Sequence, residues 1–135
     1  MLHTLDCWGV DPHLLDDEGW VHDLLEFVAR ESGATVIETT SHHFSPVGVT
    51  GVCIIAESHL AAHTWPERHY LAVDFFTCGD KVDTDLMVHL LLRDAKPSSY
   101  ELQVTPRGIL KGRTQHKHSW RRRAWRKLRS FLPKR

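Results

Sequence analysis

Three apolar, β-rich runs follow one another in the middle of the chain, and they constrain its fold more than any other feature. They cover residues 49–56, 61–65 and 70–76. Short runs that are rich in Val, Ile, Phe and Thr and are bounded by polar residues are typical of strands. Residues 52–56 also have the continuous apolar character of a buried strand. A chain with this centre is expected to build a sheet.

Helical patterns lie on both sides of these runs. Apolar side chains recur at helical spacing over residues 13–31, which predicts one helix that ends at Ser32 and Gly33. A second helix is predicted over residues 83–95, with Asp83 or Thr84 as its cap. Further β-rich runs lie at residues 2–8, 35–40 and 100–105. Together these patterns predict an α+β fold, a two-layer α/β sandwich with an antiparallel sheet and both helices on one face. The other face of the sheet must then be covered.

The length and the cysteine pattern indicate one domain in a reducing compartment. A chain of 135 residues can bury a core without covalent staples. Cys7, Cys53 and Cys78 form no CxxC pair, which argues against a disulfide framework and against a cysteine-rich zinc site. The chain has neither an apolar stretch of membrane-spanning length nor a signal-like N-terminus. A cytoplasmic protein is therefore expected.

Eleven histidines raise the question of a metal site. His42 and His43 are adjacent, and neighbouring side chains on a strand point to opposite faces, so the two cannot easily bind one ion. The chain has no HExxH motif or comparable helical spacing. No metal site is expected.

Charge divides the chain into two parts. Residues 1–106 hold all 17 acidic residues and 5 basic ones, a balance of −12, whereas residues 107–135 hold 12 basic residues and no acidic one. Such asymmetry is typical of a tail that contacts a polyanion or the acidic body of its own protein. Apolar side chains recur every fourth residue near the end of this tail, which predicts an amphipathic helix; they are Trp120, Ala124, Leu128 and Leu132.

Three polar residues, Glu57, Ser58 and His59, follow directly after the buried run at residues 52–56. Polar side chains at the end of a rigid strand are often placed there for chemistry. The same pattern also fits a plain boundary between a strand and a loop. The tripeptide alone does not decide between these interpretations.

The wider pattern resembles the self-cleavage site of the small bacterial S-adenosylmethionine decarboxylases. The agreement covers roughly residues 8–80 and includes the Glu-Ser-His tripeptide and the segment Phe-Thr-Cys-Gly-Asp at residues 76–80. The resemblance implies that the chain cleaves itself between Glu57 and Ser58, and that Ser58 becomes a pyruvoyl group. Such a carbonyl group forms a Schiff base with the substrate amine and serves as the electron sink that decarboxylation needs. The domain that does this would span residues 1–106.

The resemblance also assigns roles to individual side chains. In the self-cleavage, the Ser58 hydroxyl attacks the carbonyl of Glu57, and His63 with the hydroxyl of Thr50 assists the processing; the family usually has serine where Thr50 stands. Cys78 would then donate a proton to the carbon that has lost carbon dioxide, since a thiol is a suitable acid near neutral pH. A free cysteine in this position could equally be a buried structural thiol.

Substrate recognition is assigned by the same resemblance to Phe44, Glu67 and Asp11. Phe44 would stack on adenine, Glu67 would bind the ribose hydroxyls, and Asp11 would lie near the substrate. Without the resemblance, Phe44 would be interpreted as a core residue and Glu67 as a solvated one. The family also packs two subunits sheet on sheet into an αββα sandwich. This homodimer would draw Ser58 and Cys78 of each site from one subunit and Thr50 and His63 from the other.

Three functions are compatible with the sequence. The first is an S-adenosylmethionine decarboxylase whose product supplies aminopropyl groups for spermidine. The second is an arginine or ornithine decarboxylase with the same pyruvoyl chemistry, and the third is a non-catalytic binding homologue. Phe44 and Glu67 suit a nucleoside and favour the first function. The presence of Ser58, His63 and Cys78 together argues against the third.

Overall fold

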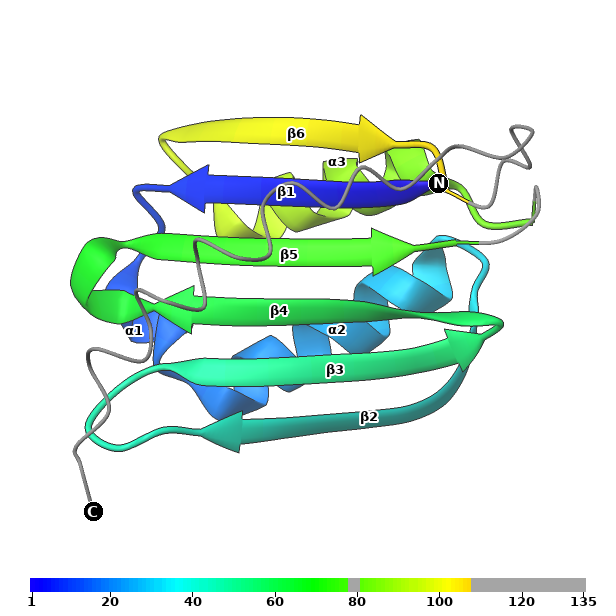
Figure 1. The fold of residues 1–135 in the computed structure, drawn as a ribbon. Coiled ribbons are helices and arrows are strands. Elements are labelled where there is room, and N and C mark those ends of the chain that lie inside the picture. The colour runs from blue at the N-terminus through cyan, green and yellow to red at the C-terminus, as the bar shows by residue number, and fades with distance from the viewer. Residues whose placement is uncertain (78–80, 108–135) are drawn as a thin grey trace, which may run out of the picture.

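The computed structural model describes residues 1–77 and 81–107, which form one six-stranded sheet with helices on one of its faces (Figure 1). The strands lie in the order β2-β3-β4-β5-β1-β6, and each pairs antiparallel with its neighbours. In chain order the elements are β1 (Leu2–Trp8), α1 (Pro12–Leu15), α2 (Glu18–Glu31), β2 (Thr35–His43), β3 (Val49–Ala56), β4 (Ser58–Trp65), η1 (Pro66–Arg68), β5 (Tyr70–Phe76), α3 (Thr84–Ala95) and β6 (Ser99–Thr105). The predicted α+β sandwich is confirmed.

The prediction of one helix over residues 13–31 is wrong, because two aspartates divide it. Asp17 accepts a hydrogen bond from the backbone N–H of Trp20 at 3.0 Å and so caps the N-terminus of α2. A side chain that satisfies the free N–H groups of a new helix favours a helix start at that point. The short helix α1 therefore ends before Asp16, whose side chain contacts the loop that precedes β3.

Two strands are longer than the sequence predicts. β2 continues to His43, which pairs with Val49, and β4 begins at Ser58, which pairs with Ile55. Ser and His have modest strand propensity, so the sequence pattern predicts a β2 that stops too early and a β4 that begins too late. Pairing with β3 holds these residues in the sheet despite their low propensity. The turn between β3 and β4 is consequently tight, and only Glu57 lies between the two strands.

The antiparallel pairing gives the sheet two distinct ends. At one end, on the left in Figure 1, β1 and β4 finish with Trp8 and Trp65, and β5 begins with Tyr70. At the other end lie Phe76 and the turn that leads into Ser58. These two regions are called the Trp65 end and the Ser58 end below.

The core lies between the sheet and the helices. Alternate residues of the central strands are buried against α2 and α3, as Leu5, Val73 and Phe75 illustrate. At Gly51 a Cβ atom would come within 2.9 Å of the Leu25 side chain of α2, so glycine permits this helix to lie close to β3. The opposite face of the sheet carries no helix from the described part of the chain (Figure 1). No described helix combines the length and the apolar character required to cross a membrane.

Candidate active site

A cavity of about 190 Å³ opens at the Trp65 end of the sheet. Its walls come from the loop between β2 and β3, from the adjoining parts of β3 and β4, and from η1. Four of the predicted site residues line it together: Phe44, Thr50, His63 and Glu67. The fold thus places a hydroxyl, an imidazole, an aromatic ring and a carboxylate around one space, although they are spread over 24 positions of the chain.

Thr50 and His63 form the polar centre of this cavity. They face each other directly across β3 and β4, and Thr50 Oγ1 lies 2.9 Å from His63 Nδ1. Both side chains are half-buried on the open face of the sheet. A hydroxyl that holds one ring nitrogen leaves the other nitrogen of the imidazole directed elsewhere. This arrangement suits an imidazole that exchanges protons with a bound group.

Phe44 and Glu67 flank the pair and are accessible. The Phe44 side chain is 48% exposed, and its ring meets His42 edge-on, with centroids 4.7 Å apart. A face of this ring is therefore free to stack on a planar group. Glu67 is exposed on η1, where its carboxylate can accept hydrogen bonds from a diol.

Two residues that the sequence analysis missed hold the cavity wall in place. The buried Thr64 hydroxyl accepts from the N–H of Val49 at 2.7 Å and donates to the carbonyl of Leu15 at 2.6 Å. Asp16 Oδ1 accepts from the N–H of Gly48 at 2.9 Å and lies 2.8 Å from His43 Nε2. The Gly48 N–H, and to a lesser degree His43, lowers the pKa of the Asp16 carboxyl. No sequence pattern indicates a functional role for Asp16, because the helical spacing over residues 13–31 predicts that it lies inside a longer helix.

Asp16→Ala is expected to raise KM for the substrate by about 2- to 10-fold while kcat changes less than about twofold. The substitution removes the acceptor that holds the Gly48 N–H, so the loop loses a hydrogen bond that fixes its position. Phe44 lies in the loop that Gly48 ends, so binding is affected more than the chemical step. Steady-state kinetics measure this, with the exposed Asp23→Ala as a matched control on α2. A loss confined to kcat would contradict a positioning role for Asp16.

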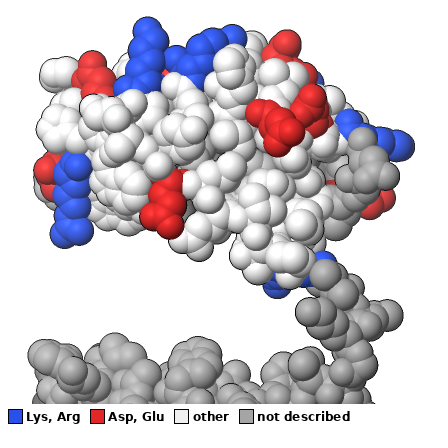
Figure 2. Space-filling view, turned by 90° about the horizontal axis from the view of Figure 1, so that it is seen from above, with Lys and Arg blue, Asp and Glu red and all other residues white. Residues whose placement is uncertain are grey.

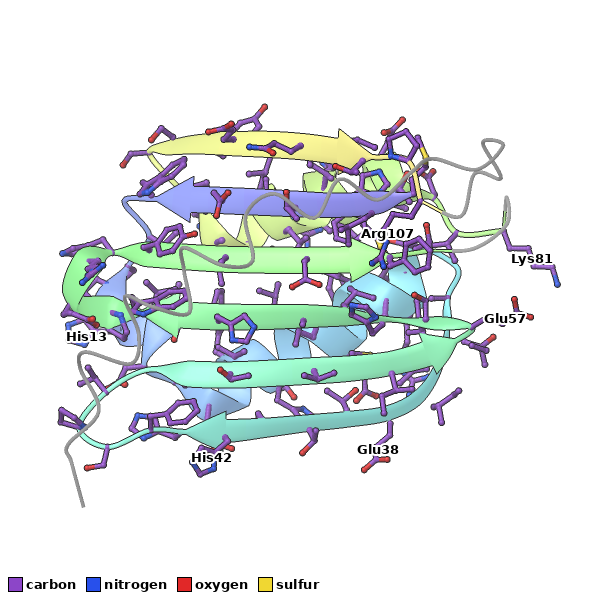
Figure 3. All side chains as sticks on the ribbon, in the orientation of Figure 1. His13, Glu38, His42, Glu57, Lys81 and Arg107 are labelled. Carbon is purple, nitrogen blue, oxygen red and sulfur yellow. The ribbon has the colours of Figure 1, made fainter. Side chains whose placement is uncertain are left out.

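Ser58 lies at the opposite end of the sheet from this cavity. It is the first residue of β4, and its Oγ is buried without a hydrogen-bond partner in the described structure. Glu57 lies at the tip where β3 turns into β4 (Figure 3). A buried hydroxyl without a partner is uncommon in folded proteins. No hydrogen bond within the described residues thus holds the Ser58 hydroxyl, and this is compatible with the attack on the Glu57 carbonyl that the sequence predicts.

One chain does not bring Ser58 and His63 together. They are five residues apart on the same strand, or about 16 Å at the usual rise, and an odd separation directs their side chains to opposite faces. Ser58 is in phase with the core residues Leu60 and Ala62, whereas His63 belongs to the open face. Cys78 lies outside the described residues.

Asp11 has a local structural partner. Its carboxylate caps α1 by accepting from the N–H of His13 at 2.9 Å, and it lies at the Trp65 end without lining the cavity. The structure therefore does not group Asp11 with the other four residues around this space.

Further titratable groups occupy both faces of the sheet. His59 Nε2 lies 3.2 Å from Asp74 Oδ2, and the Tyr70 hydroxyl donates to Asp6. Burial and the Asp6 bond raise the pKa of Tyr70 to about 12. Burial, with a smaller contribution from Asp6, raises the pKa of the Cys7 thiol to about 11, so it stays protonated. Within residues 1–77 and 81–107, no three His, Cys, Asp or Glu side chains gather as metal ligands would.

Comparison with known sequences places most of the chain in one group. The family model described as S-adenosylmethionine decarboxylase matches residues 2–108. A Methanococcus maripaludis protein named S-adenosylmethionine decarboxylase proenzyme is 40% identical over 106 residues, which are 78% of this chain and 87% of that protein. A Pseudomonas aeruginosa protein of the same name is 47% identical over 109 residues, covering 81% of this chain and 66% of its own length.

Solved structures agree with the sequence comparison. The adenosylmethionine decarboxylase of Aquifex aeolicus superposes with a TM-score of 0.74 at 33% identity, covering 84% of this chain and 95% of its own. A monomeric Trypanosoma brucei protein, AdoMetDC-delta26, superposes with a TM-score of 0.57 at 16% identity, covering 75% of this chain and 44% of its own. At that identity the second likeness concerns the fold alone.

Proposed function

The chain belongs to the S-adenosylmethionine decarboxylase family, and we propose that it decarboxylates S-adenosylmethionine with a pyruvoyl group made from its own Ser58. The observation that carries this proposal is the cavity that joins Phe44, Thr50, His63 and Glu67. These are the groups needed to bind a nucleoside and to move a proton beside it. The product would supply aminopropyl groups for spermidine synthesis.

The processing step uses only protein groups, with Ser58 and Glu57 from one copy of the chain and His63 and Thr50 from a second copy. The Ser58 hydroxyl attacks the carbonyl carbon of Glu57, and the acyl group moves from nitrogen to oxygen. His63, held by Thr50 at 2.9 Å, removes the α-proton of residue 58. The ester bond to Ser58 Oγ then breaks, and the main-chain carboxylate of Glu57 leaves as the new C-terminus of residues 1–57. Hydrolysis of the resulting dehydroalanine releases ammonia and leaves the pyruvoyl group. This group supplies the carbonyl that accepts the electrons released with carbon dioxide.

A complete site requires two copies of the chain, since Ser58 and His63 lie at opposite ends of one sheet. We propose a homodimer in which the open faces pack as an αββα sandwich and the Trp65 end of one copy meets the Ser58 end of its partner. Exposed apolar side chains on this face support the arrangement: Ile54 is 40% exposed and Trp8 is 39% exposed. A twofold axis between the copies would create two identical sites.

Within each proposed site the remaining residues have distinct tasks. Phe44 stacks on the adenine and Glu67 accepts hydrogen bonds from the ribose hydroxyls. Asp11 adds negative charge close to the cationic substrate. Cys78, which lies outside the described residues, donates the proton that replaces the lost carboxylate.

Two alternatives are distinguishable by experiment. An arginine or ornithine decarboxylase would use the same Ser58 but would have no need of an aromatic ring and a carboxylate spaced for a nucleoside. A non-catalytic binding homologue would have no need of a buried, unpartnered Ser58 hydroxyl. Both observations favour the S-adenosylmethionine decarboxylase.

Carbon dioxide release from S-adenosylmethionine, L-arginine and L-ornithine tests the assignment. We expect release from S-adenosylmethionine alone, and mass spectrometry should identify the decarboxylated product. Glu67→Gln is expected to raise KM for S-adenosylmethionine by about 10- to 100-fold, because a charge-assisted hydrogen bond contributes about 1.5–3 kcal/mol. Arg68→Gln, next to it on η1, is the matched control. Release from arginine or ornithine alone would overturn the substrate, and release from none would favour a binding protein.

Two further proposals concern the setting of the enzyme. Cys7 and Cys53 are buried free thiols, which supports a reducing, cytoplasmic location.

The basic tail at residues 107–135, most of which lies outside the described residues, is proposed to contact a polyanion. Binding of this kind should weaken steeply as salt rises, because Lys and Arg contacts release counterions.

A further inference from the structure

The edge strand β6 carries an uncovered apolar stripe on its helix side. Tyr100 is 55% exposed, Leu102 is 39% exposed and Val104 is 45% exposed. These three residues pair with Cys7, Leu5 and His3 of β1, which are all buried beneath the helices. The stripe therefore belongs to the face that the helices cover, yet its side chains remain exposed. In Figure 1, α3 lies behind β1 and behind the gap between β1 and β6, and β6 forms the upper edge of the sheet.

One side of α3 borders this stripe. Arg93 lies over the Phe27 ring of α2 at 5.4 Å, so that flank of α3 is directed toward α2. Val88 and Leu92 are half-buried on the other flank, and they follow Asp85 at i+3 and i+7 on one helix face. Asp85 and Val104 line one cavity of about 650 Å³ between the start of α3 and the end of β6. The space between α3 and β6, called the groove below, is thus bordered by Val88 and Leu92 on one side and by the stripe on the other. At one end it meets this cavity, whose lining also includes Met1, His3 and Thr77. In the view from the β6 side, charged side chains of both signs lie among uncharged residues (Figure 2).

The chain itself offers an occupant of matching size. The segment at residues 120–132 places Trp120, Ala124, Leu128 and Leu132 on one side at helical spacing. A helix of that length would extend about 20 Å, and β6 with its seven residues extends about 23 Å. The connection over residues 106–119 can reach up to about 45 Å. It is thus long enough to turn back over the strand that it follows.

Charge supports the same occupant. Residues 1–107 contain 17 acidic and 6 basic residues, whereas residues 120–132 contain 6 basic residues and no acidic one. The net field of the acidic body attracts a basic segment that is tethered to it. Asp85 lies at the end of the groove where β6 finishes. The segment also lies beyond residue 108, where the family match ends, so the fold of the relatives does not account for it.

We propose that residues 120–132 form a further helix, beyond α1, α2 and α3, that docks in the groove between α3 and β6. Its apolar side covers Tyr100, Leu102 and Val104, and its basic side faces the solvent. The helix layer then spans the whole sheet. Because the basic side stays outward, docking is compatible with contact to a polyanion. No residue of the proposed active site takes part, so this inference and the proposed function fail independently.

Limited trypsin digestion of the full chain, followed by mass spectrometry, tests the docking. Lys111, Arg113 and Lys117 lie in the connecting segment, whereas six Lys and Arg sites lie within residues 121–129. We expect cleavage in the connecting segment to be at least about tenfold faster than within residues 121–129, also in 1 M salt, since burial of apolar surface is not screened by salt. Equal rates at the two groups of sites would overturn the proposal. Protection that appears only after heparin is added would also overturn it.

Substitutions in the groove and in the tail provide matched controls. Leu102→Asp should remove the protection, whereas Ile37→Asp, at an apolar position that is 65% exposed on the opposite edge strand, should keep it. Leu128→Asp changes the tail alone and should remove the protection without altering the folded body. Leu110→Asp in the connecting segment should keep it. If both Leu102→Asp and Leu128→Asp keep the protection, the docking is wrong; if Leu102→Asp fails to fold, Leu128→Asp decides.

Discussion

Ser58→Ala protein is expected to remain one chain of 135 residues under conditions in which the wild-type protein separates into residues 1–57 and 58–135. The substitution removes the hydroxyl that attacks the carbonyl of Glu57. Alanine has no group that could replace it as the nucleophile. The same variant should lack decarboxylase activity, because it cannot form the pyruvoyl group. This is the largest effect that we expect from any single substitution.

A denaturing gel and intact mass measurement check this result. The wild-type fragment 58–135 should be lighter by the mass of one ammonia than a peptide that begins with serine. Ser99→Ala, an exposed serine on β6, serves as the control and should cleave normally. Wild-type protein that stays intact while it decarboxylates would contradict the assignment, as would cleavage of the Ser58→Ala chain.

His63→Ala is expected to slow self-cleavage by about 10²- to 10⁴-fold, the usual contribution of a general base. In contrast, Cys78→Ala should cleave normally and decarboxylate poorly, since its proposed role begins only after processing. A time course of cleavage, measured beside the activity of each variant, separates the two steps. The reverse pattern would show that the roles of His63 and Cys78 have been exchanged.

The two-copy site makes a sharper demand on His63. In a mixed dimer of His63→Ala and Ser58→Ala chains, the intact Ser58 of the first would meet the intact His63 of the second. Co-expression of the two chains with different tags should therefore restore cleavage, and only in the His63→Ala chain. A double variant, His63→Ala with Ser58→Ala, replaces the second chain as the control and should not restore it. Without restored cleavage in the mixed dimer, the proposed packing of the open faces is wrong.

Several elements of the fold follow directly from local sequence patterns. The strands at residues 2–8, 49–56 and 70–76 agree with their predicted bounds because each has a continuous β-rich or apolar run. The second helix agrees as well, with Asp83 as its cap through a 2.9 Å bond to the N–H of Leu86. The errors lie where local patterns compete. At Asp16 and Asp17 a helical pattern continues in the sequence, but side-chain capping divides the helix.

The sequence alone determined which chemical groups the site contains, because a nucleophilic hydroxyl, an imidazole and a carboxylate are properties of single residues and their spacing. Only the tertiary structure decided which of them meet. The pairing of β3 with β4 places Thr50 against His63, and η1 adds Glu67 to the wall of the same cavity. The same pairing holds Ser58 about 16 Å from His63, on the other face of the sheet. Ser58 and His63 are only five positions apart in the sequence, but an extended strand separates their side chains too far for them to meet within one chain.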